Sequence, residues 1–262
     1  MNIFSLVGII GTFAAIVISM YWGGTGVMPF VSIPSVFIVV VASFCIVMLA
    51  GPKSEDSVGM FKLMGLAFKT PDFGEQTIAK KFIALSEKAR REGLLSLEEE
   101  MEDIEDQFLQ GGLRLAIDGT DKEVILGLLE IDITKMQERH AKRLRTLELW
   151  ATVAPACGMW GTVIGLVGMM QSLSSDPGAV GANMATALIT TLYGSVIANA
   201  VAIPISKKLR IYDTNEVNSK EMIIEGILSI QAGENTRILS QKLLSYLPPA
   251  DRKDLEQIMK ND

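Results

Sequence analysis

The sequence predicts an all-α polytopic membrane protein with four transmembrane helices and a helical cytoplasmic domain. Two observations predict this fold class. The 262-residue chain is 49% hydrophobic with a mean hydropathy of +0.33, which is unusually apolar for a soluble protein. The apolar residues also occur in blocks, since residues 1–52 contain no Asp, Glu, Lys, Arg or His and residues 147–206 contain only Glu148 and Asp176. Each block can hold two helices of roughly 20 residues, the length that crosses a bilayer.

The first block is expected to form two spans. The stretch from Ile3 to Trp22 has no basic residues before it and is too long for the apolar part of a signal peptide, so it is predicted to be a membrane helix. Glycines at positions 23, 24 and 26 then favour a turn. The second span is expected from about Ile33 to Ala50, with Pro34 in its first turn, where a missing amide hydrogen costs little.

Residues 53–147 change abruptly to charged, amphipathic sequence. Apolar side chains recur at helical spacing between Ile78 and Leu85, which predicts a helix there. A long helix is expected from Asp121 to Thr146, and it enters the third span without a helix breaker. This segment is therefore predicted to be a helical domain outside the membrane.

An acidic stretch lies within that domain. Ser96 followed three residues later by Glu99 is a capping-box signature, so a helix is expected to begin there. That helix would carry the acidic residues between Glu98 and Asp106, a pattern typical of a solvated helix face.

The third and fourth spans are predicted from Leu149 to Leu173 and from Asn183 to Ser206, joined by a polar loop over residues 174–182. Both spans carry small residues at helical spacing, so each has a face on which another helix can approach closely. The glycines expected to make these helix-packing faces are Gly158, Gly161, Gly165, Gly168 and Gly194.

Oxygen atoms that could bind a cation lie in the same two spans. Pro155 and Pro204 lack the amide hydrogen that would bond the carbonyl four residues earlier, so each frees a carbonyl oxygen within the membrane. Thr162, Thr190 and Thr191 add hydroxyl groups. A threonine in a membrane helix commonly bonds its own backbone. Together, however, these groups are oxygen ligands of the kind that a hard cation such as sodium prefers.

The spans lack an ionisable side chain near their middle, although ion pathways through bilayers normally use one. Either the protein conducts nothing, or a second polypeptide supplies the carboxylate. The two small-residue faces favour the second alternative, because they suggest that a further helix packs there. A net charge of −6 speaks against nucleic-acid binding. One histidine, two cysteines within apolar segments and no nucleophile or phosphate-loop motif leave no basis for an enzyme, a cofactor or a permanent metal site.

Basic residues indicate the orientation of the spans. Lys53, Lys142, Arg143 and Arg145, and Lys207, Lys208 and Arg210 flank the spans on one side, which the positive-inside rule places in the cytoplasm with both termini. The C-terminal segment from Ile211 to Leu247 is amphipathic and is expected to pack on the loop domain. The predicted segments are the first two spans (1–52), the cytoplasmic loop domain (53–147), the last two spans (148–206) and the cytoplasmic C-terminal helix and tail (207–262).

Four runs of residues resemble one family. They are APACGMWGTVIGLVGMM (154–170), ALITTLYGSVIANAVAIPISKKLR (187–210), EGILSIQAGENTRILSQKLLSYLPP (225–249) and KARREGLLSLE (88–98). Each is similar to the A-subunit of the bacterial flagellar stator, the MotA/PomA family, and the resemblance covers the whole chain. A more distant similarity is to the ExbB/TolQ energising proteins, which lack the first of the four spans.

The resemblance implies a division of labour between subunits. Stator A-subunits form a ring of five copies around two copies of a MotB/PomB-like B-subunit, whose single span supplies the membrane aspartate. Ion flow across the inner membrane turns the ring, and the loop domain pushes a FliG-like rotor switch protein. By the same resemblance, Pro155 and Pro204 match two prolines near the ion-binding aspartate, and Arg90 and Glu98 match the charged pair that contacts the rotor.

The resemblance also bears on the transported ion. Thr162, Thr190 and Thr191 match positions at which sodium-driven, PomA-like members carry threonine, so sodium bound transiently near these residues is favoured over protons. Two alternatives remain at this point: an ExbB/TolQ-like energiser of outer-membrane processes and a non-conducting membrane scaffold.

Overall fold

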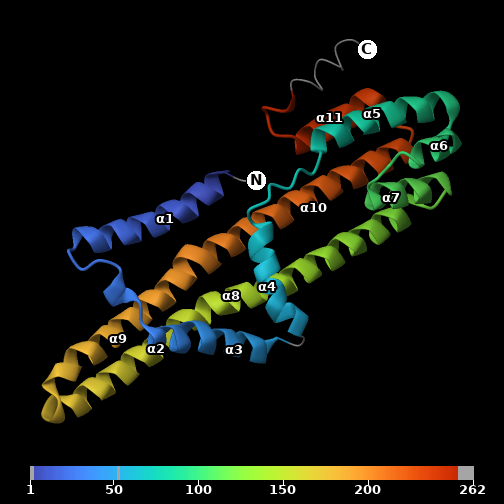
Figure 1. Ribbon diagram of the computed structural model, residues 1–262. Helices are drawn as coiled ribbons and strands as arrows, with labels where there is room; N and C mark the ends of the chain where they lie inside the picture. The colour runs from blue at the N-terminus through green and yellow to red at the C-terminus, as the bar shows by residue number, and fades with distance from the viewer. Residues whose placement is uncertain (1–2, 52–53, 253–262) are drawn as a thin grey trace. The chain divides into compact units, whose positions relative to one another are not determined.

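The computed structural model describes residues 3–51 and 54–252, and in those ranges all regular structure is helical (Figure 1). The all-α prediction is therefore confirmed. The α-helices are α1 (Ile3–Trp22), α2 (Ile33–Val36), α3 (Ala42–Ala50), α4 (Ser54–Leu66), α5 (Glu75–Glu92), α6 (Glu98–Met101), α7 (Gln107–Ile117), α8 (Lys122–Ser175), α9 (Pro177–Val196), α10 (Ile203–Gln231) and α11 (Thr236–Tyr246). The described residues also form two 3-10 helices, η1 (Met28–Phe30) and η3 (Leu94–Leu97), and two π-helical segments, η2 (Phe37–Val41) and η4 (Ile197–Ala202).

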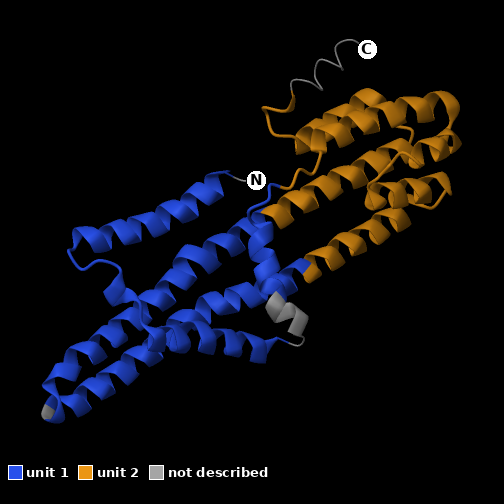
Figure 2. Ribbon diagram, in the orientation of Figure 1, with its two compact units in different colours: residues 1–70, 140–211 blue, residues 71–139, 212–262 orange. Residues whose placement is uncertain are grey.

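The chain divides into two compact units, and each is built from two separated stretches (Figure 2). The first unit contains residues 1–70 and 140–211, and the second contains residues 71–139 and 212–262. The first unit includes α4, which the sequence assigned to the loop domain. This helix lies with the apolar helices because it contacts α3, where the rings of Phe44 and Phe61 have centroids 5.7 Å apart.

Among the residues that the structure describes, four helical stretches are long and apolar enough to cross a membrane. They begin at Ile3, Ile33, Lys122 and Pro177, which agrees with the number and order of the predicted spans. The third stretch is the long helix expected to run into the membrane, since α8 continues for 54 residues and passes through Pro155 without ending. The chain is a multi-pass membrane protein by these criteria.

The predicted loop over residues 174–182 is wrong. Helix α8 ends at Ser175 and α9 begins at Pro177, so Asp176 alone separates them. The Asp176 carboxylate accepts a hydrogen bond from the Gly178 amide, and Pro177 occupies the first turn of α9. An Asp cap followed by proline is a strong helix start, and it begins α9 earlier than its polar composition suggested.

Side-chain hydrogen bonds hold the second span and the turn before it against the last two spans. The Trp150 indole donates to the Ser43 hydroxyl at 3.0 Å, and both side chains are buried. The Tyr193 hydroxyl donates to the Phe30 carbonyl at 2.5 Å. Polar groups in lipid must find partners within the protein, so these two bonds fix α3 to α8 and η1 to α9.

The second unit has one apolar core, in which α5, α7, α10 and α11 meet the first turns of α8. Phe82 of α5 and Ile227 of α10 are fully buried there, and Gly226 lets the Phe82 ring approach the α10 backbone. The expectation that the C-terminal segment packs on the loop domain is confirmed.

The acidic stretch does not form the expected helix. The Ser96 hydroxyl donates to the Gly93 carbonyl at 2.7 Å and makes no capping box, and α6 ends at Met101. Asp106 instead caps the next helix, accepting a hydrogen bond from the Phe108 amide at 2.8 Å. Several residues in this stretch can cap a helix, and packing of α7 into the core selects Asp106.

Candidate functional site

The α8–α9 hairpin uses the glycines as a contact between its own two helices. A β-carbon on Gly161 would lie 2.4 Å from Cγ2 of Thr190, and one on Gly165 would lie 2.7 Å from Cβ of Ala187. On the opposite helix, a β-carbon on Gly194 would lie 2.7 Å from the Ala154 carbonyl oxygen. Gly158 and Gly168 make similar contacts with α9. The two small-residue faces pack on each other. The sequence suggested that they serve a helix of a second polypeptide, but the faces by themselves do not require one.

Hydroxyl and carbonyl oxygens gather at the edge of this contact. The hydroxyl oxygens of Thr162 and Thr191 lie 2.7 Å apart, and both lie 3.3 Å from the Ala187 carbonyl oxygen. The Thr162 hydroxyl is also 3.1 Å from the Gly158 carbonyl oxygen. Thr191 is exposed and Thr162 is half-buried, so this group of oxygens, called here the threonine pair, opens onto the outside of the hairpin.

Of the other predicted ion-path residues, Thr190 shares the Ala187 carbonyl with the threonine pair but is buried, and the two prolines lie elsewhere. Thr190 has 0% exposure, packs against Gly161 and donates to the Ala187 carbonyl at 2.8 Å, so its hydroxyl faces the α8–α9 contact. Pro155 lies beside Gly194 in that contact. Pro204 is exposed on the side of α10 that faces α1.

A π-helical turn precedes Pro204. In η4 the Ile203 amide donates to the Ala198 carbonyl, five residues earlier. A wider turn of this kind rearranges the backbone bonding just before a residue that has no amide hydrogen. The sequence indicated a freed carbonyl here but gave no sign of the π-helix.

Neither carboxylate of the last two spans lies at the threonine pair. Glu148 forms an ion pair with Arg210 at 2.6 Å, and Asp176 caps α9. Within the described residues, no group of three His, Cys, Asp or Glu side chains is placed to hold a metal ion. The threonine pair therefore offers neutral oxygen ligands without a charge to balance a bound cation.

The predicted rotor-contact residues lie at the two ends of a tight connection in the second unit. Arg90 is in the last turn of α5, Glu98 begins α6, and both are exposed. Gly93 has φ +89°, a conformation that side chains rarely tolerate, and it reverses the chain between them.

A salt bridge closes the same connection. Lys88 of α5 lies 2.7 Å from Glu100 of α6, and Lys81 donates to the Asp103 carbonyl at 3.1 Å. The hydrogen bond to Glu100 raises the pKa of Lys88, and the same bond lowers the pKa of Glu100. These contacts tie α5 to α6 and to the residues that follow α6.

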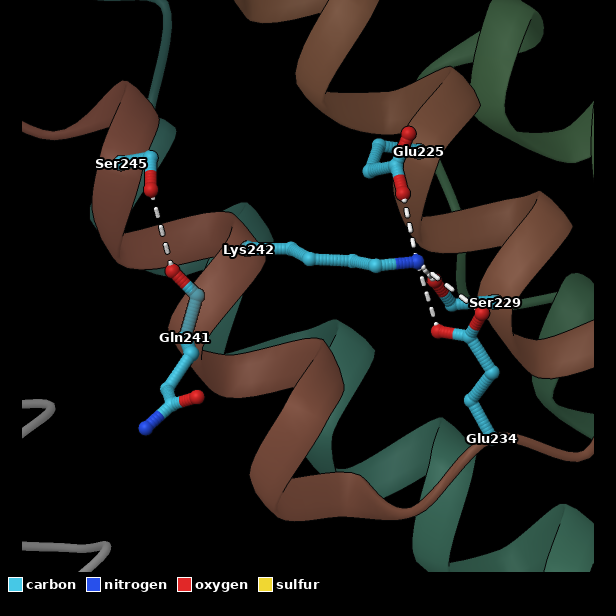
Figure 3. Close-up of polar contacts among 6 residues, drawn as sticks. All are labelled: Glu225, Ser229, Glu234, Gln241, Lys242 and Ser245. Atoms are coloured by element: carbon cyan, nitrogen blue, oxygen red, sulfur yellow. Dashed lines mark hydrogen bonds and ion pairs between the residues drawn. The ribbon is translucent and has the colours of Figure 1, made fainter.

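A lysine network joins α10 to α11 (Figure 3). The Lys242 ammonium lies 2.8 Å from Glu225, 2.7 Å from Glu234 and 3.2 Å from the Ser229 hydroxyl. Hydrogen bonds to Glu225 and Glu234 raise the pKa of Lys242, and the bond from Lys242 lowers the pKa of Glu234. The sequence showed these residues only as part of a family-like run, because their meeting depends on the turn after α10.

Replacing Lys242 with methionine is expected to lower the free energy of unfolding by about 1 kcal/mol at neutral pH, the scale of a partly exposed charge-assisted network. The pKa of Glu234 lies below its ordinary value of 4.5. Its contribution to the free energy of unfolding is therefore complete above pH 4.5 and is lost as the pH falls through the lower folded-state pKa. The contribution of Lys242 to the free energy of unfolding is lost only above pH 10.5, the ordinary pKa of lysine, because its folded-state pKa is raised. Thermal unfolding at neutral and acid pH measures the difference.

Gln241→Met is the matched control, since Gln241 is an exposed neighbour on α11. An equal loss of stability in the two variants would contradict a role for the network. So would a Lys242→Met defect that grows as the pH is lowered.

Fold and site together define a multi-pass helical membrane protein with oxygen ligands in its spans and no carboxylate beside them. Residues 100–222 match the model of the MotA/TolQ/ExbB proton channel family. The chain is 47% identical to motility protein A of Treponema phagedenis, over 98% of each chain, and 37% identical to the chemotaxis protein PomA of Vibrio alginolyticus, over 96% of this chain and 98% of that one. The chain therefore belongs to the motility protein A family, as the resemblance implied.

Solved structures agree with this assignment. The flagellar MotAB stator complex of Bacillus subtilis contains a chain that matches with a TM-score of 0.86 and 31% identity, covering 94% of this chain and 96% of that chain. The MotAB structure from C. jejuni matches with the same TM-score at 25% identity, over 95% of this chain and 97% of that one. The four-span fold with a helical second unit is thus the fold of these subunits.

Proposed function

We propose that this chain is the A-subunit of a bacterial flagellar stator, a sodium-driven torque generator of the inner membrane. The observation that carries the proposal is the threonine pair, which presents converging oxygen atoms on the outside of the α8–α9 hairpin with no carboxylate beside it. The names of the relatives and of the stator structures support the motor role over an ExbB/TolQ-like energiser or a passive scaffold.

A B-subunit similar to MotB or PomB would supply the missing aspartate. The related structures contain MotA together with MotB. The hairpin keeps apolar side chains exposed, such as Met159 at 62% and Trp160 at 54%, which need cover from lipid or from further chains. A ring of five copies around the B-subunit span would provide that cover and bring the aspartate to the threonine pair.

In this assembly the termini and the charged unit face the cytoplasm. The basic residues at positions 142–145 and 207–210 support that orientation through the positive-inside rule. Residues 53–147 and 207–262 would then form the cytoplasmic part, with residues 1–52 and 148–206 in the membrane. Arg90 and Glu98 would contact a FliG-like rotor switch protein from this side.

Sodium is proposed over protons because hydroxyl and carbonyl oxygens are the ligands of a hard cation. Cells that depend on this chain and its B-subunit are expected to stop swimming when sodium is replaced by potassium at constant pH. Thr162→Ala is expected to weaken sodium dependence, because it removes the hydroxyl that contacts Thr191, Ala187 and Gly158. Swimming speed against sodium concentration is the measurement.

Thr152→Ala is the control, since the Thr152 hydroxyl bonds only its own helix, at the Glu148 carbonyl. Swimming that is unchanged by the exchange of sodium for potassium would reject sodium coupling. It would leave the stator role standing with protons as the driving ion.

A further inference from the structure

A groove in the first unit lies between α1 and the continuous helix formed by α9, η4 and α10. Its volume is about 560 Å³, within the roughly 300–1,000 Å³ of ligand pockets. One wall is the face of α1 that carries Ser5, Gly8 and Thr12, and the other wall carries Asn199, Pro204 and Lys208. Figure 1 shows α1 running beside this helix, and α1 contacts η4.

The walls of the groove are apolar in effect. The Thr12 hydroxyl donates to the Gly8 carbonyl at 2.9 Å, and the Asn199 amide donates to the Ser195 carbonyl at 3.0 Å. These donors are bonded within their own helices, and the residues between them, such as Ile9, Ile16 and Ala200, give the groove a mainly aliphatic surface. Such a surface suits a hydrocarbon chain.

One end of the groove is positively charged. Lys208 is half-buried there, and its ammonium donates a hydrogen bond to the Ser5 hydroxyl, which brings the start of α1 beside α10. Lys208 belongs to the basic cluster that follows the fourth span, so this end lies where the membrane meets water. A lysine at that depth attracts the anionic headgroups of the adjacent leaflet.

The groove has the length of one leaflet. Its α1 wall runs from Ser5 to Ile16, and the eleven residue steps between them span roughly 16 Å at 1.5 Å per residue. Half of a bilayer core is about 15 Å. A chain anchored at Lys208 would therefore lie in the groove down to the middle of the membrane.

We propose that this groove binds one anionic phospholipid, with an acyl chain between α1 and the α9–α10 helix and the phosphate on the Lys208 ammonium. The residues that line the groove include neither threonine of the threonine pair and no residue of α8. The proposal depends on the four-span topology and not on the stator role.

The test uses the full chain purified with its B-subunit and incubated in vesicles of phosphatidylcholine, with or without phosphatidylglycerol. Native mass spectrometry then counts the lipids that each complex retains. The wild type is expected to retain phosphatidylglycerol in preference to phosphatidylcholine. Gly8→Phe is expected to retain none, because nothing lies within 4 Å of a β-carbon at Gly8 and the ring would enter the groove.

Matched variants separate the groove from general damage. Gly11→Phe places the same ring in open space on α1, at a residue that does not line the groove, and it should behave as wild type. Lys208→Gln should weaken retention of phosphatidylglycerol roughly fivefold, the effect of one lysine at an anionic surface. Lys207→Gln, an exposed neighbour outside the groove, should have no effect.

Three results would overturn the proposal. They are equal retention of the two lipids by the wild type, equal retention by Gly8→Phe and Gly11→Phe, and a wild type that retains no lipid because a helix of a neighbouring copy fills the groove. The stator role is tested separately, by whether cells that carry Gly11→Phe swim. Swimming would support the stator role even if the lipid proposal were overturned.

Discussion

Replacing Gly161 with leucine is expected to abolish assembly of the protein in the membrane. A β-carbon at this position would lie 2.4 to 2.6 Å from three atoms of the Thr190 side chain, which has no exposed surface and cannot move aside. The helices would have to separate, and the loss of packing costs more than the roughly 1–3 kcal/mol of ordinary overpacking. Helix association in lipid depends on this close packing. The yield and thermal stability of the detergent-solubilised protein measure the effect.

Gly181→Leu is the control, because nothing lies within 4 Å of a β-carbon at that exposed position of α9. A milder exchange tests the same contact from both sides. Gly161→Ala alone should destabilise the protein, and adding Thr190→Gly should restore part of the loss by returning the space. Normal assembly of Gly161→Leu would show that α8 and α9 do not pack through this face.

Reversing Arg90 and Glu98 together is expected to stop rotation while the protein still assembles. Both side chains are exposed, so charge reversal should leave the core of the second unit intact, yet it would oppose the charges of a rotor partner. Two measurements are needed. Swimming reports rotation, and co-purification with the B-subunit reports assembly.

The exposed ion pair between Lys135 and Glu138 on α8 provides the control. Exchanging those two residues keeps their pair and their exposure, so swimming should continue. If the Arg90 and Glu98 reversal instead prevented assembly, the pair would be structural. Normal swimming would show that these charges do not contact the rotor.

The spans could be predicted because their signal is local. The backbone of a single uncharged run such as Ile3–Trp22 can satisfy its own hydrogen bonds in lipid only as a helix, so length and composition indicate its structure. The fit of the C-terminal segment to the loop domain followed from amphipathic spacing in the same way. Predicting these features does not require knowing which helix surfaces contact each other.

The partners of the small-residue faces could not be predicted. The spacing of Gly158 and Gly161 shows that a helix can approach closely, but it does not say which helix does so. The structure places α9 of the same chain there. Likewise, the neighbouring Thr190 and Thr191 look alike in sequence, and only the rotation of α9 makes the first buried and the second exposed.

Helix boundaries were hard to predict because several residues in one stretch can cap a helix. Ser96 and Asp106 are both good capping residues, and the sequence gives no reason to prefer the second. Asp176 and Pro177 form a strong helix-start signal, but the polar residues around them are typical of a loop. The Lys242 network arises only when α11 folds back on α10, so no local pattern announces it.

Sodium flux into sealed vesicles under a membrane potential tests the central claim most directly. Three preparations are compared: this chain alone, the chain with its B-subunit, and the chain with a B-subunit whose membrane aspartate is replaced by asparagine. If the oxygen ligands come from this chain and the charge from its partner, only the intact pair should carry sodium. Sodium entry through vesicles that contain this chain alone would contradict the account.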